Sequence, residues 1–357
     1  MKEVKQKKGR GSGINPPNPY HNLSHDYEQD LEDNPYEYRE DVDEKTQFIK
    51  VHPKTIINKV ISADIPMMYS VNPYQGCEHG CIYCYARPTH NYWGYSAGTE
   101  FETRIMVKEN AASLLRREVL AKKWKVAPIS FSGNTDCYQP AERKFQITRQ
   151  MLQVMTDLKH PVGIITKNSL ILRDLDLLQQ LQKDQLIRVY ISITTLDETL
   201  RRAMEPRTAS ISQKLKTIET LSKAGIPVGV MMAPVIPGLN SHEIIEMAKV
   251  TSDAGALDMG YTVVRLNGQL GEIFKSWLAV NYPERSDKII HQIEELHGGQ
   301  LEDKRTGKRM RGEGKLAEII KDTFRLARQK YFNDNNLPEL NLGAFIGSGI
   351  KQLVLFE

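Results

Sequence analysis

The chain has 357 residues, of which 40% are hydrophobic and 26% are charged, with 48 Lys and Arg against 44 Asp and Glu. These proportions are close to those of ordinary globular proteins, and they exclude collagen-like, fully disordered and integral membrane classes. The net charge of +4 does not by itself indicate a nucleic-acid-binding protein, because such binding depends on a local basic stripe rather than a mild overall excess.

Residues 1–64 are uneven in composition. A basic tip precedes a run rich in Gly, Pro and Asn, and ten acidic residues then lie between Asp26 and Glu44 against a single Arg39. Such a segment resists packing on its own. We interpret residues 1–64 as a partly disordered N-terminal extension, either a solvated tail or a strap laid over a basic surface of the body.

Residues 65–268 alternate short β-branched or apolar runs with longer amphipathic segments, a pattern that predicts βα units and a parallel sheet covered by helices. Helical patterns that lie between the strands include two that end at Gly225 and Gly255, which can adopt a left-handed cap. Six units are too few for a closed eight-stranded barrel, so the pattern alone leaves a partial barrel and a doubly wound sheet open. The predicted strands are 67–73, 128–132, 161–166, 187–194, 226–232 and 256–266, and the predicted helices are 110–124, 141–158, 173–182, 212–225 and 241–255.

Residues 269–357 are expected to form a helical C-terminal region, with helices around 273–278, 288–296 and 316–331 and no further strand. The loop DKRTGKRMRGEGK, residues 303–315, is strongly basic and supplies the local stripe that the overall charge conceals. Either it is a solvated loop, or it binds phosphate, since its glycines would let the backbone approach an anion.

Cysteines are clustered at one place in the chain. Cys77, Cys81 and Cys84 lie within eight residues directly after the first predicted strand, and Cys137 stands alone. No run of about 18 uncharged apolar residues and no apolar N-terminal segment is present, so we expect a cytoplasmic protein without membrane contact. In a reducing compartment clustered cysteines bind metal or catalyse more often than they form disulfides.

Two kinds of metal site suit this cluster. A structural zinc ion needs four ligands, and His79, His90 or Cys137 could supply the fourth. Three thiolates on one compact loop also suit three corners of a [4Fe-4S] cluster, with one iron left open. Because the loop follows a strand, either site would lie at the C-terminal edge of the sheet, where βα folds carry their chemistry.

The C-x3-C-x2-C spacing in NPYQGCEHGCIYC resembles the motif of the radical S-adenosylmethionine (SAM) superfamily. The chain looks most like the spore photoproduct lyase-like group, and is closest to an uncharacterised bacterial family within it, through segments such as TDCYQPAER, ITKNSLILRDLDLL, ISITTLDETLRRAMEPR, VGVMMAPVIPGLN and GEGKLAEIIKDTFRLA. The resemblance implies an α/β fold, a partial (β/α)6 barrel with the N-terminal extension and helical C-terminal region named above.

The resemblance also implies a reaction. Cys77, Cys81 and Cys84 would bind a [4Fe-4S] cluster whose open iron chelates SAM. An electron from a donor such as flavodoxin or ferredoxin would then cleave SAM to methionine and a 5′-deoxyadenosyl radical. Tyr83 and Tyr85 flank the last cysteine, where aromatic side chains of the superfamily cover the cluster and approach the adenine, although core-packing tyrosines would look the same.

Further SAM ligands are implied at three strand ends. Thr135 and Asp136 follow the second strand, where related enzymes hold the methionine amino group, or they cap a helix instead. Lys167 and Ser192 match positions that bind the SAM carboxylate in the spore photoproduct lyase-like group; the alternative for Lys167 is an exposed lysine at the start of a loop.

Three other residues have less specific roles. Glu205 and Arg207 form either a supporting pair or an ordinary ion pair at a helix end. Cys137 is a candidate hydrogen-atom donor, because spore photoproduct lyase uses a cysteine near this strand end. Alignment on Thr135 and Asp136 places Gly133 at that position, however, and a small buried hydrophobe is the alternative for Cys137.

The segment 85–108 is long for a βα loop and contains Tyr92, Trp93, Tyr95 and Phe101 among Pro, Gly and Asn. We expect it to cover the mouth of the sheet, either as a platform for stacked bases beside the basic loop or as a roof that shields the cluster from oxygen and water.

The C-terminal residues KQLVLFE resemble the short peptide with which bacterial replication and repair proteins dock on the sliding clamp. Gln352 would supply an amide contact, and Leu353, Leu355 and Phe356 would fill apolar pockets. A terminal strand packed on the protein's own body is the alternative.

Three functions are compatible with the sequence. The first is a radical SAM enzyme that acts on nucleic acid, in repair or modification. The second acts on a peptide or another small molecule, and the third is a zinc-stabilised module that binds nucleic acid or the clamp without catalysis. Metal and sulfide analysis separates the third from the other two.

Overall fold

The structure is a computed structural model that describes residues 9–20, 45–65, 67–332 and 337–347. Its centre is a seven-stranded sheet in the order β10-β9-β8-β7-β6-β3-β2, in which six strands run parallel and β2 pairs antiparallel with β3. The strands are β2 (Ile57–Lys59), β3 (Tyr69–Val71), β6 (Ile129–Phe131), β7 (Val162–Thr166), β8 (Ile187–Ser192), β9 (Val228–Val235) and β10 (Asp258–Val263). The six parallel strands confirm the six strands predicted from the sequence.

The order of the strands decides between the two predicted architectures. From β3 to β10 each parallel strand lies beside the next parallel strand along the chain. A doubly wound sheet reverses its order at a switch point, and no reversal occurs here. The sheet is therefore a partial (β/α)6 barrel, and the C-terminal ends of all six parallel strands meet at one edge.

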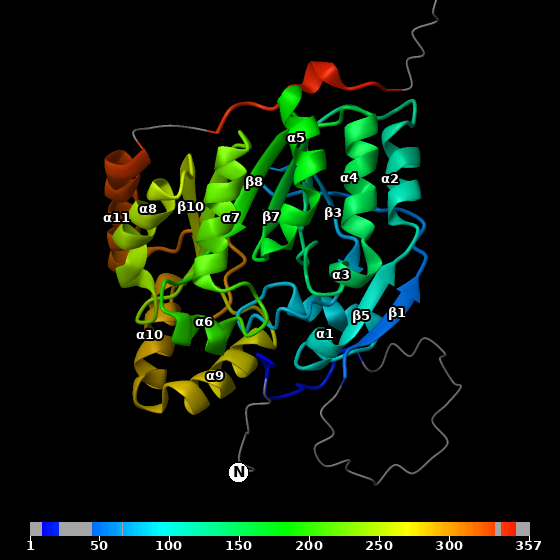
Figure 1. Ribbon diagram of the computed structural model, residues 1–357. Coiled ribbons are helices and arrows are strands. Elements are labelled where there is room, and N and C mark those ends of the chain that lie inside the picture. The colour runs from blue at the N-terminus through cyan, green and yellow to red at the C-terminus, as the bar shows by residue number, and fades with distance from the viewer. Residues whose placement is uncertain (1–8, 21–44, 66, 333–336, 348–357) are drawn as a thin grey trace, which may run out of the picture.

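Helices connect the parallel strands and cover one face of the sheet (Figure 1). Strand β8 shows how the two faces differ: Ile187, Val189 and Ile191 are buried in the core under the helices, whereas Arg188 and Tyr190 line a cavity on the other face. The covering helices are α2 (Ala111–Val119), α3 (Glu142–Phe145), α4 (Ile147–Asp157), α5 (Leu175–Lys183), α7 (Ile211–Lys223) and α8 (Ile244–Asp253), with 3-10 turns at Ser169–Asp174 and Ser241–Glu243.

One predicted helix is divided. Residues 141–158 form α3 and α4, which are separated by Gln146 with a φ of 53°. The carboxylate of Glu142 accepts hydrogen bonds from the backbone N–H groups of Thr148 (3.0 Å) and Arg149 (3.3 Å), so it caps the free amides at the start of α4. The predicted stops at Gly225 and Gly255 are confirmed, since both residues have positive φ.

A second, three-stranded sheet has the order β1-β5-β4 and consists of β1 (Gln47–Val51), β4 (Tyr74–Gln75) and β5 (Arg104–Lys108). Strand β5, together with a 3-10 helix (Arg87–Trp93) and α1 (Glu100–Thr103), lies in the segment that we expected to be a loop. The run Ile105, Met106 and Val107 is almost fully buried, which is why it forms a strand. Strands β1 and β2 come from residues that we assigned to the N-terminal extension, whose acidic part, 26–44, lies outside the described residues.

The C-terminal region contains the three predicted helices, α9 (Leu270–Asn281), α10 (Ser286–Leu296) and α11 (Gly314–Phe332), and the short helix α6 (Glu198–Met204) lies near α9 (Figure 1). Helix α11 packs against α8 and β10, and the ring of Phe324 stacks on Tyr261 with centroids 4.1 Å apart. The domain boundaries at residues 64 and 268 stay a prediction.

Residues 337–347 cross the end of the sheet opposite the cysteines (Figure 1, red). Backbone bonds hold them there: the N–H of Asn341 donates to the carbonyl of Gln185 (2.9 Å), and the N–H of Ile346 donates to the carbonyl of Leu158 (2.8 Å). The clamp-binding residues predicted above, Gln352, Leu353, Leu355 and Phe356, lie outside the described residues.

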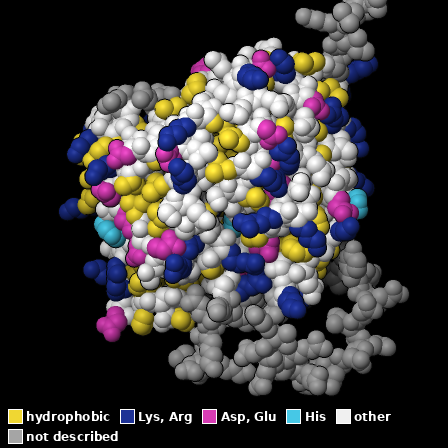
Figure 2. Space-filling model, viewed as in Figure 1, with side chains coloured by type: hydrophobic (Ala, Val, Ile, Leu, Met, Phe, Trp, Pro, Cys, Tyr) yellow, Lys and Arg dark blue, Asp and Glu magenta, His cyan; other side chains and the backbone are white. Residues whose placement is uncertain are grey.

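The surface over the covering helices carries basic, acidic and apolar side chains interspersed with one another (Figure 2). Within the described ranges, no helix combines the length and the apolar character needed to cross a bilayer.

Candidate active site

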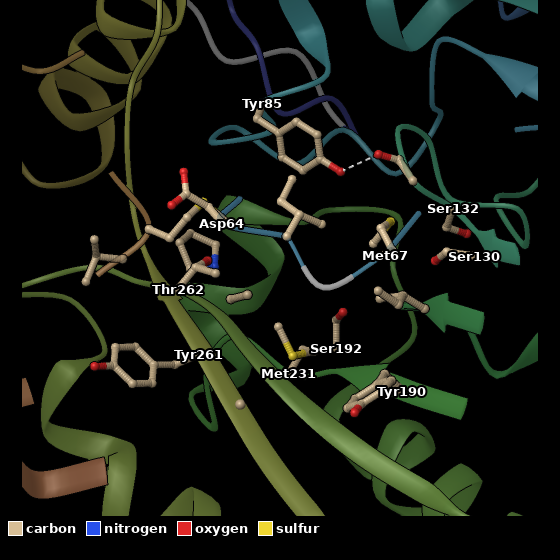
Figure 3. A pocket seen from close by; sticks show the side chains of 18 of the residues that line it. Asp64, Met67, Tyr85, Ser130, Ser132, Tyr190, Ser192, Met231, Tyr261 and Thr262 are labelled. Atoms are coloured by element: carbon tan, nitrogen blue, oxygen red, sulfur yellow. Dashed lines mark hydrogen bonds between the residues drawn. The ribbon is translucent and has the colours of Figure 1, made fainter. Parts of the chain in front are cut away.

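A cavity of about 1640 Å³ begins at the C-terminal ends of the parallel strands and continues along the inner face of the sheet to α11. Figure 3 shows its walls: Asp64 and Thr262 lie on one side, Ser130 and Ser132 on the other, and Ser192 and Met231 between them. Ligand sites in proteins are commonly about 300 to 1,000 Å³, so this cavity has room for more than one small molecule.

Cys77, Cys81 and Cys84 all line this cavity. None of them is in a disulfide, and Cys77 and Cys81 are buried. Burial raises the pKa of the Cys77 thiol, and the nearby charges of Asp136, Cys81 and Cys84 raise it further. The thiols are thus close enough to affect one another's ionisation, and a cation among them would favour the thiolate forms.

The loop that carries the three cysteines, residues 77–84, is called the cysteine loop. It is stabilised by Arg87, which is 0% exposed. Its Nε donates to the backbone carbonyl of Cys81 (2.9 Å), and one terminal nitrogen forms an ion pair with Glu102 (2.5 Å), which is also 0% exposed. The other terminal nitrogen donates to the carbonyls of Ala97 and Gly98. This pair could not be predicted from the sequence, because the burial of a charged residue is not visible in a local pattern.

The described part of the N-terminal segment also binds Glu102. The backbone N–H groups of Gly11 and Ser12 donate to the carboxylate of Glu102 at 3.0 Å and 2.9 Å. A Cβ atom on Gly11 would lie 1.7 Å from the carbonyl oxygen of Gly80, so only glycine allows the two backbones to come this close. The segment therefore seals the cysteine loop on the side away from the cavity.

Tyr83 is fixed by a buried ion pair. Its hydroxyl donates to the carboxylate of Glu205, which also accepts from Thr194 (2.5 Å) and pairs with Lys214 (3.0 Å). Burial alone would raise the pKa of Glu205, but the charges of Lys214 and Lys167 lower it to about 2. The carboxylate is therefore ionised and holds the hydroxyl of Tyr83, a residue that lies between the last two cysteines in the sequence.

The suggested pairing of Glu205 with Arg207 is not observed. Glu205 pairs with Lys214, which is one turn into the following helix, α7, and Arg207 lies 3.4 Å from Glu78 instead. Both Glu78 and Glu205 are buried, so the partner of each carboxylate is the cation that lies beside it in the folded protein.

Lys167 follows β7 and lines the cavity, with its ammonium 6.0 Å from the centre of the Tyr83 ring. Burial would lower its pKa, but the charges of Cys81, Glu205 and Asp136 outweigh this effect and raise it. Across the described residues, nothing accepts a hydrogen bond from this ammonium. It is a stable cation that faces the cavity and is free to bind an anion.

Asp136, which follows β6, is hydrogen-bonded to residues at the end of β7. One carboxylate oxygen accepts from the backbone N–H of Tyr138 and the hydroxyl of Thr166, both at 2.8 Å, and the other accepts from the backbone N–H of Lys167 (2.8 Å). The residue still lines the cavity. The bond to Tyr138 is the local capping contact that we considered as the alternative, so Asp136 shapes the turn and faces the cavity at once.

The other predicted SAM ligands also line the cavity. Thr135 is buried and donates to the carbonyl of Tyr74 (2.7 Å), and Ser192 is the last residue of β8. Tyr85 is half exposed, and its hydroxyl donates to the carbonyl of Gly133 across the cavity mouth at 2.9 Å (Figure 3).

Cys137 lies elsewhere. It is 0% exposed, belongs to the main hydrophobic core, and is absent from the cavity lining. Its backbone N–H donates to the hydroxyl of Ser132 (2.8 Å). This position matches the packing alternative, and the hydrogen-donor role stays a prediction without geometric support.

Known proteins with a similar sequence or fold were compared with this chain. Residues 71–250 match the Radical SAM superfamily. An uncharacterized protein of Mycobacterium tuberculosis is 34% identical over 253 residues, which are 70% of this chain and 73% of that protein. The chain belongs to the radical SAM superfamily. An uncharacterized protein of Methanocaldococcus jannaschii is 29% identical over 249 residues, 70% of this chain and 88% of that one.

The fold of this radical SAM protein is similar to that of spore photoproduct lyase. A variant of that enzyme with bound AdoMet and dinucleoside spore photoproduct has a TM-score of 0.59 and 15% identity, with 80% of this chain and 79% of that chain covered. At this identity the likeness shows the fold alone, and it confirms the expected architecture.

The donor set of this radical SAM protein fits a [4Fe-4S] cluster. Three free thiols from one loop face one cavity, and a cubane takes one thiolate for each of three irons. A structural zinc ion instead needs four ligands within about 2.0 to 2.3 Å of one point. Among the residues that the structure describes, no three His, Cys, Asp or Glu side chains form such a group.

The two histidines considered for zinc lie in different places. His79 lines the cavity, where its Nδ1 is 3.4 Å from Asp136, and burial lowers its pKa to about 4. His90 is fully buried and packs against the rings of Tyr95 and Phe101.

The basic loop of this radical SAM protein is largely paired with its own acids. Arg305 binds Asp303 and Glu313, and Lys308 also binds Glu313. Arg309 binds Asp64 at 2.5 Å. The loop therefore presents much less free positive charge than its sequence indicates.

Proposed function

We propose that this chain binds a [4Fe-4S] cluster through Cys77, Cys81 and Cys84, holds SAM beside it, and acts on nucleic acid. The observation that carries the proposal is that the three free thiols share one cavity with the ammonium of Lys167, which has no hydrogen-bond acceptor among the described residues. When bound, the cluster would supply the electron that cleaves SAM, and the radical so released would attack a C–H bond of the substrate. The electron would come from a partner such as flavodoxin or ferredoxin.

The residues around the thiols fit the two ends of a methionine moiety. Lys167 is a cation at the end of β7 and would bind the carboxylate. The hydroxyl of Ser192, at the end of the neighbouring strand β8, would bind the same carboxylate, and Asp136, which follows β6, is an acceptor suited to the amino group. Tyr83 and Tyr85 would cover the ligand and exclude water from the cluster, because both side chains line the cavity that the cysteines share.

The far part of the cavity supports a nucleic-acid substrate. The Tyr261 ring is stacked on Phe324, and the guanidinium of Arg311 lies 4.1 Å from the centre of the same ring. Because this buried ring already has a partner on each face, the support comes from the cations that line the same part of the cavity, Arg311, Lys321 and Arg325, which suit the phosphates of a nucleic acid. Spore photoproduct lyase, whose fold is similar, has been solved with a dinucleoside substrate.

The proposal is tested by turnover. Protein reconstituted anaerobically with iron and sulfide is incubated with SAM, a reductant and single-stranded or double-stranded DNA, RNA or a mixed peptide library, and products are analysed by mass spectrometry. We expect a mass change in a nucleic acid that depends on SAM. A product from the peptide library alone, with the nucleic acids unchanged, would contradict the substrate class.

Replacement of Lys167 by methionine should weaken SAM binding by about tenfold or more, because the carboxylate loses its charge-assisted hydrogen bond. The cysteine ligands are untouched, so iron content should equal that of the wild type. Equilibrium dialysis with SAM measures the affinity. Lys144→Met is a matched control, since Lys144 is an exposed lysine at the end of α3, outside the cavity lining. Equal SAM affinity of the two variants would remove Lys167 from the site.

A further inference from the structure

The open side of the partial barrel lies between β10 and β2, and two segments close it. The basic loop runs along β10, where the N–H of Val263 donates to the carbonyl of Met310 (3.0 Å) and Arg311 donates to the carbonyl of Tyr261 (2.9 Å). The connection between β2 and β3 meets this loop at Asp64. The contact at Asp64 therefore joins the two segments that close this side of the cavity.

The carboxylate of Asp64 occupies a site that is suited to an anion. One oxygen accepts from the backbone N–H of Gly307 (2.6 Å), and the other accepts from Nε of Arg309 (2.5 Å), whose terminal nitrogen binds Ser62 (2.7 Å). Gly307 has a φ of 83°, a conformation that turns its N–H toward the anion and that glycine adopts without strain. The N–H of Gly307 and the two nearby guanidinium groups, Arg309 and Arg265, lower the pKa of Asp64.

Arg265 supplies a second cation beside Asp64. It follows β10, is half-buried and lines the cavity together with Asp64 and Gly307. Within the part of the chain that the structure describes, its guanidinium forms no hydrogen bond or ion pair, although it lies near enough to Arg309 for their charges to oppose each other. Two cations so placed favour an anion with more charge than one carboxylate carries.

We propose that Gly307, Arg309 and Arg265 form a phosphate seat at the side of the cavity, and that Asp64 occupies this seat until a phosphate group of the substrate displaces it. A phosphate offers more acceptor oxygens than a carboxylate, so it can bind the backbone N–H and both guanidinium groups together. The inference rests on the proposed function in one respect, namely that the phosphate belongs to the nucleic-acid substrate.

Displacement of Asp64 disturbs little packing. In the connection that carries it, Ile61 is 89% exposed and Met68 is 56% exposed, so these apolar side chains bury little surface in the closed arrangement. A segment with few buried apolar contacts opens at low cost in free energy.

The test measures binding of a fluorescent thymidine hexanucleotide to reconstituted protein, without SAM or reductant. Asp64→Asn should bind about fivefold more tightly than wild type, because the competing carboxylate loses its charge. Glu313→Gln removes one negative charge from the basic loop itself and should change the affinity less than about twofold. Asp64→Ala provides a second measurement if the asparagine variant folds poorly.

A second matched pair removes positive charge. Arg309→Gln should weaken binding by about tenfold, whereas Lys308→Gln, which leaves the seat intact, should weaken it less than about threefold. Inorganic phosphate serves as competitor: if it displaces the hexanucleotide in Asp64→Asn, the seat takes free phosphate, and if only oligonucleotides compete, it takes a phosphodiester. Iron content and the midpoint of thermal unfolding check that each variant is folded.

The proposal is overturned if Asp64→Asn binds no more tightly than Glu313→Gln and Arg309→Gln binds no more weakly than Lys308→Gln. Asp64 would then only connect the β2–β3 connection to the basic loop. Because no SAM is cleaved in this assay, its outcome is independent of the turnover experiment above, and each proposal can fail while the other holds.

Discussion

Arg87→Met is expected to lower the free energy of unfolding by about 3 to 5 kcal/mol, because it leaves a buried carboxylate without its cation. Arg87 and Glu102 are both 0% exposed, so the carboxylate that loses its cation lies away from solvent. The carbonyl of Cys81 also loses its donor, so the cysteine loop should become mobile. Iron content after reconstitution should fall together with the midpoint of urea unfolding.

The matched control is Arg202→Met. Arg202 pairs with Glu198, but its side chain is 73% exposed, so its removal should change stability by less than about 1 kcal/mol. The double variant Arg87→Met, Glu102→Gln should recover part of the loss, since it no longer buries an unpaired charge. Equal midpoints for Arg87→Met and Arg202→Met would contradict the structural role.

Lys214→Met should have the second large effect, a loss of about 3 kcal/mol or more, because Glu205 is 0% exposed and Lys214 is its direct partner. Loss of the ammonium removes the largest of the effects that lower the pKa of Glu205. A protonated Glu205 would no longer hold the Tyr83 hydroxyl in the same way, so the surroundings of Cys81 and Cys84 should change as well. Urea unfolding measures the stability, and the electron paramagnetic resonance spectrum of the reduced protein reports on the cluster.

Lys223→Met provides the comparison for this variant. It breaks the exposed pair of Lys223 with Glu219 in the same helix, α7, and should cost less than about 1 kcal/mol. The double variant Lys214→Met, Glu205→Gln should be more stable than Lys214→Met alone. If it is not, the two buried charges do not depend on each other.

Local sequence was enough to predict the features that depend on neighbouring residues. Each parallel strand lies in a short β-branched or apolar run, and the cysteine motif lies in one loop, so periodicity and spacing identified both. Gly225 and Gly255 ended helices as predicted because helix termination is a local property. The predicted cavity residues came together for the same reason, since each follows a strand and all the strand ends share one edge.

The errors arose where a distant residue decides the outcome. Arg309 is one of six cations in an apparently free basic stripe, but it pairs with Asp64, which lies 245 residues away along the chain. Glu205 binds Lys214 rather than the adjacent Arg207 because the fold turns α7 toward it. Burial of Arg87 beside Cys81 likewise follows from packing of the N-terminal segment on the cysteine loop.

The most direct test of the central claim is metal, sulfide and nucleoside analysis of anaerobically prepared protein. We predict about four irons and four acid-labile sulfides per chain, and release of 5′-deoxyadenosine from SAM on reduction. Cys81→Ala should lose the iron and the release, whereas Cys137→Ala, which changes a cysteine in the core, should retain both. One equivalent of zinc without sulfide, or unchanged iron content in Cys81→Ala, would contradict the account.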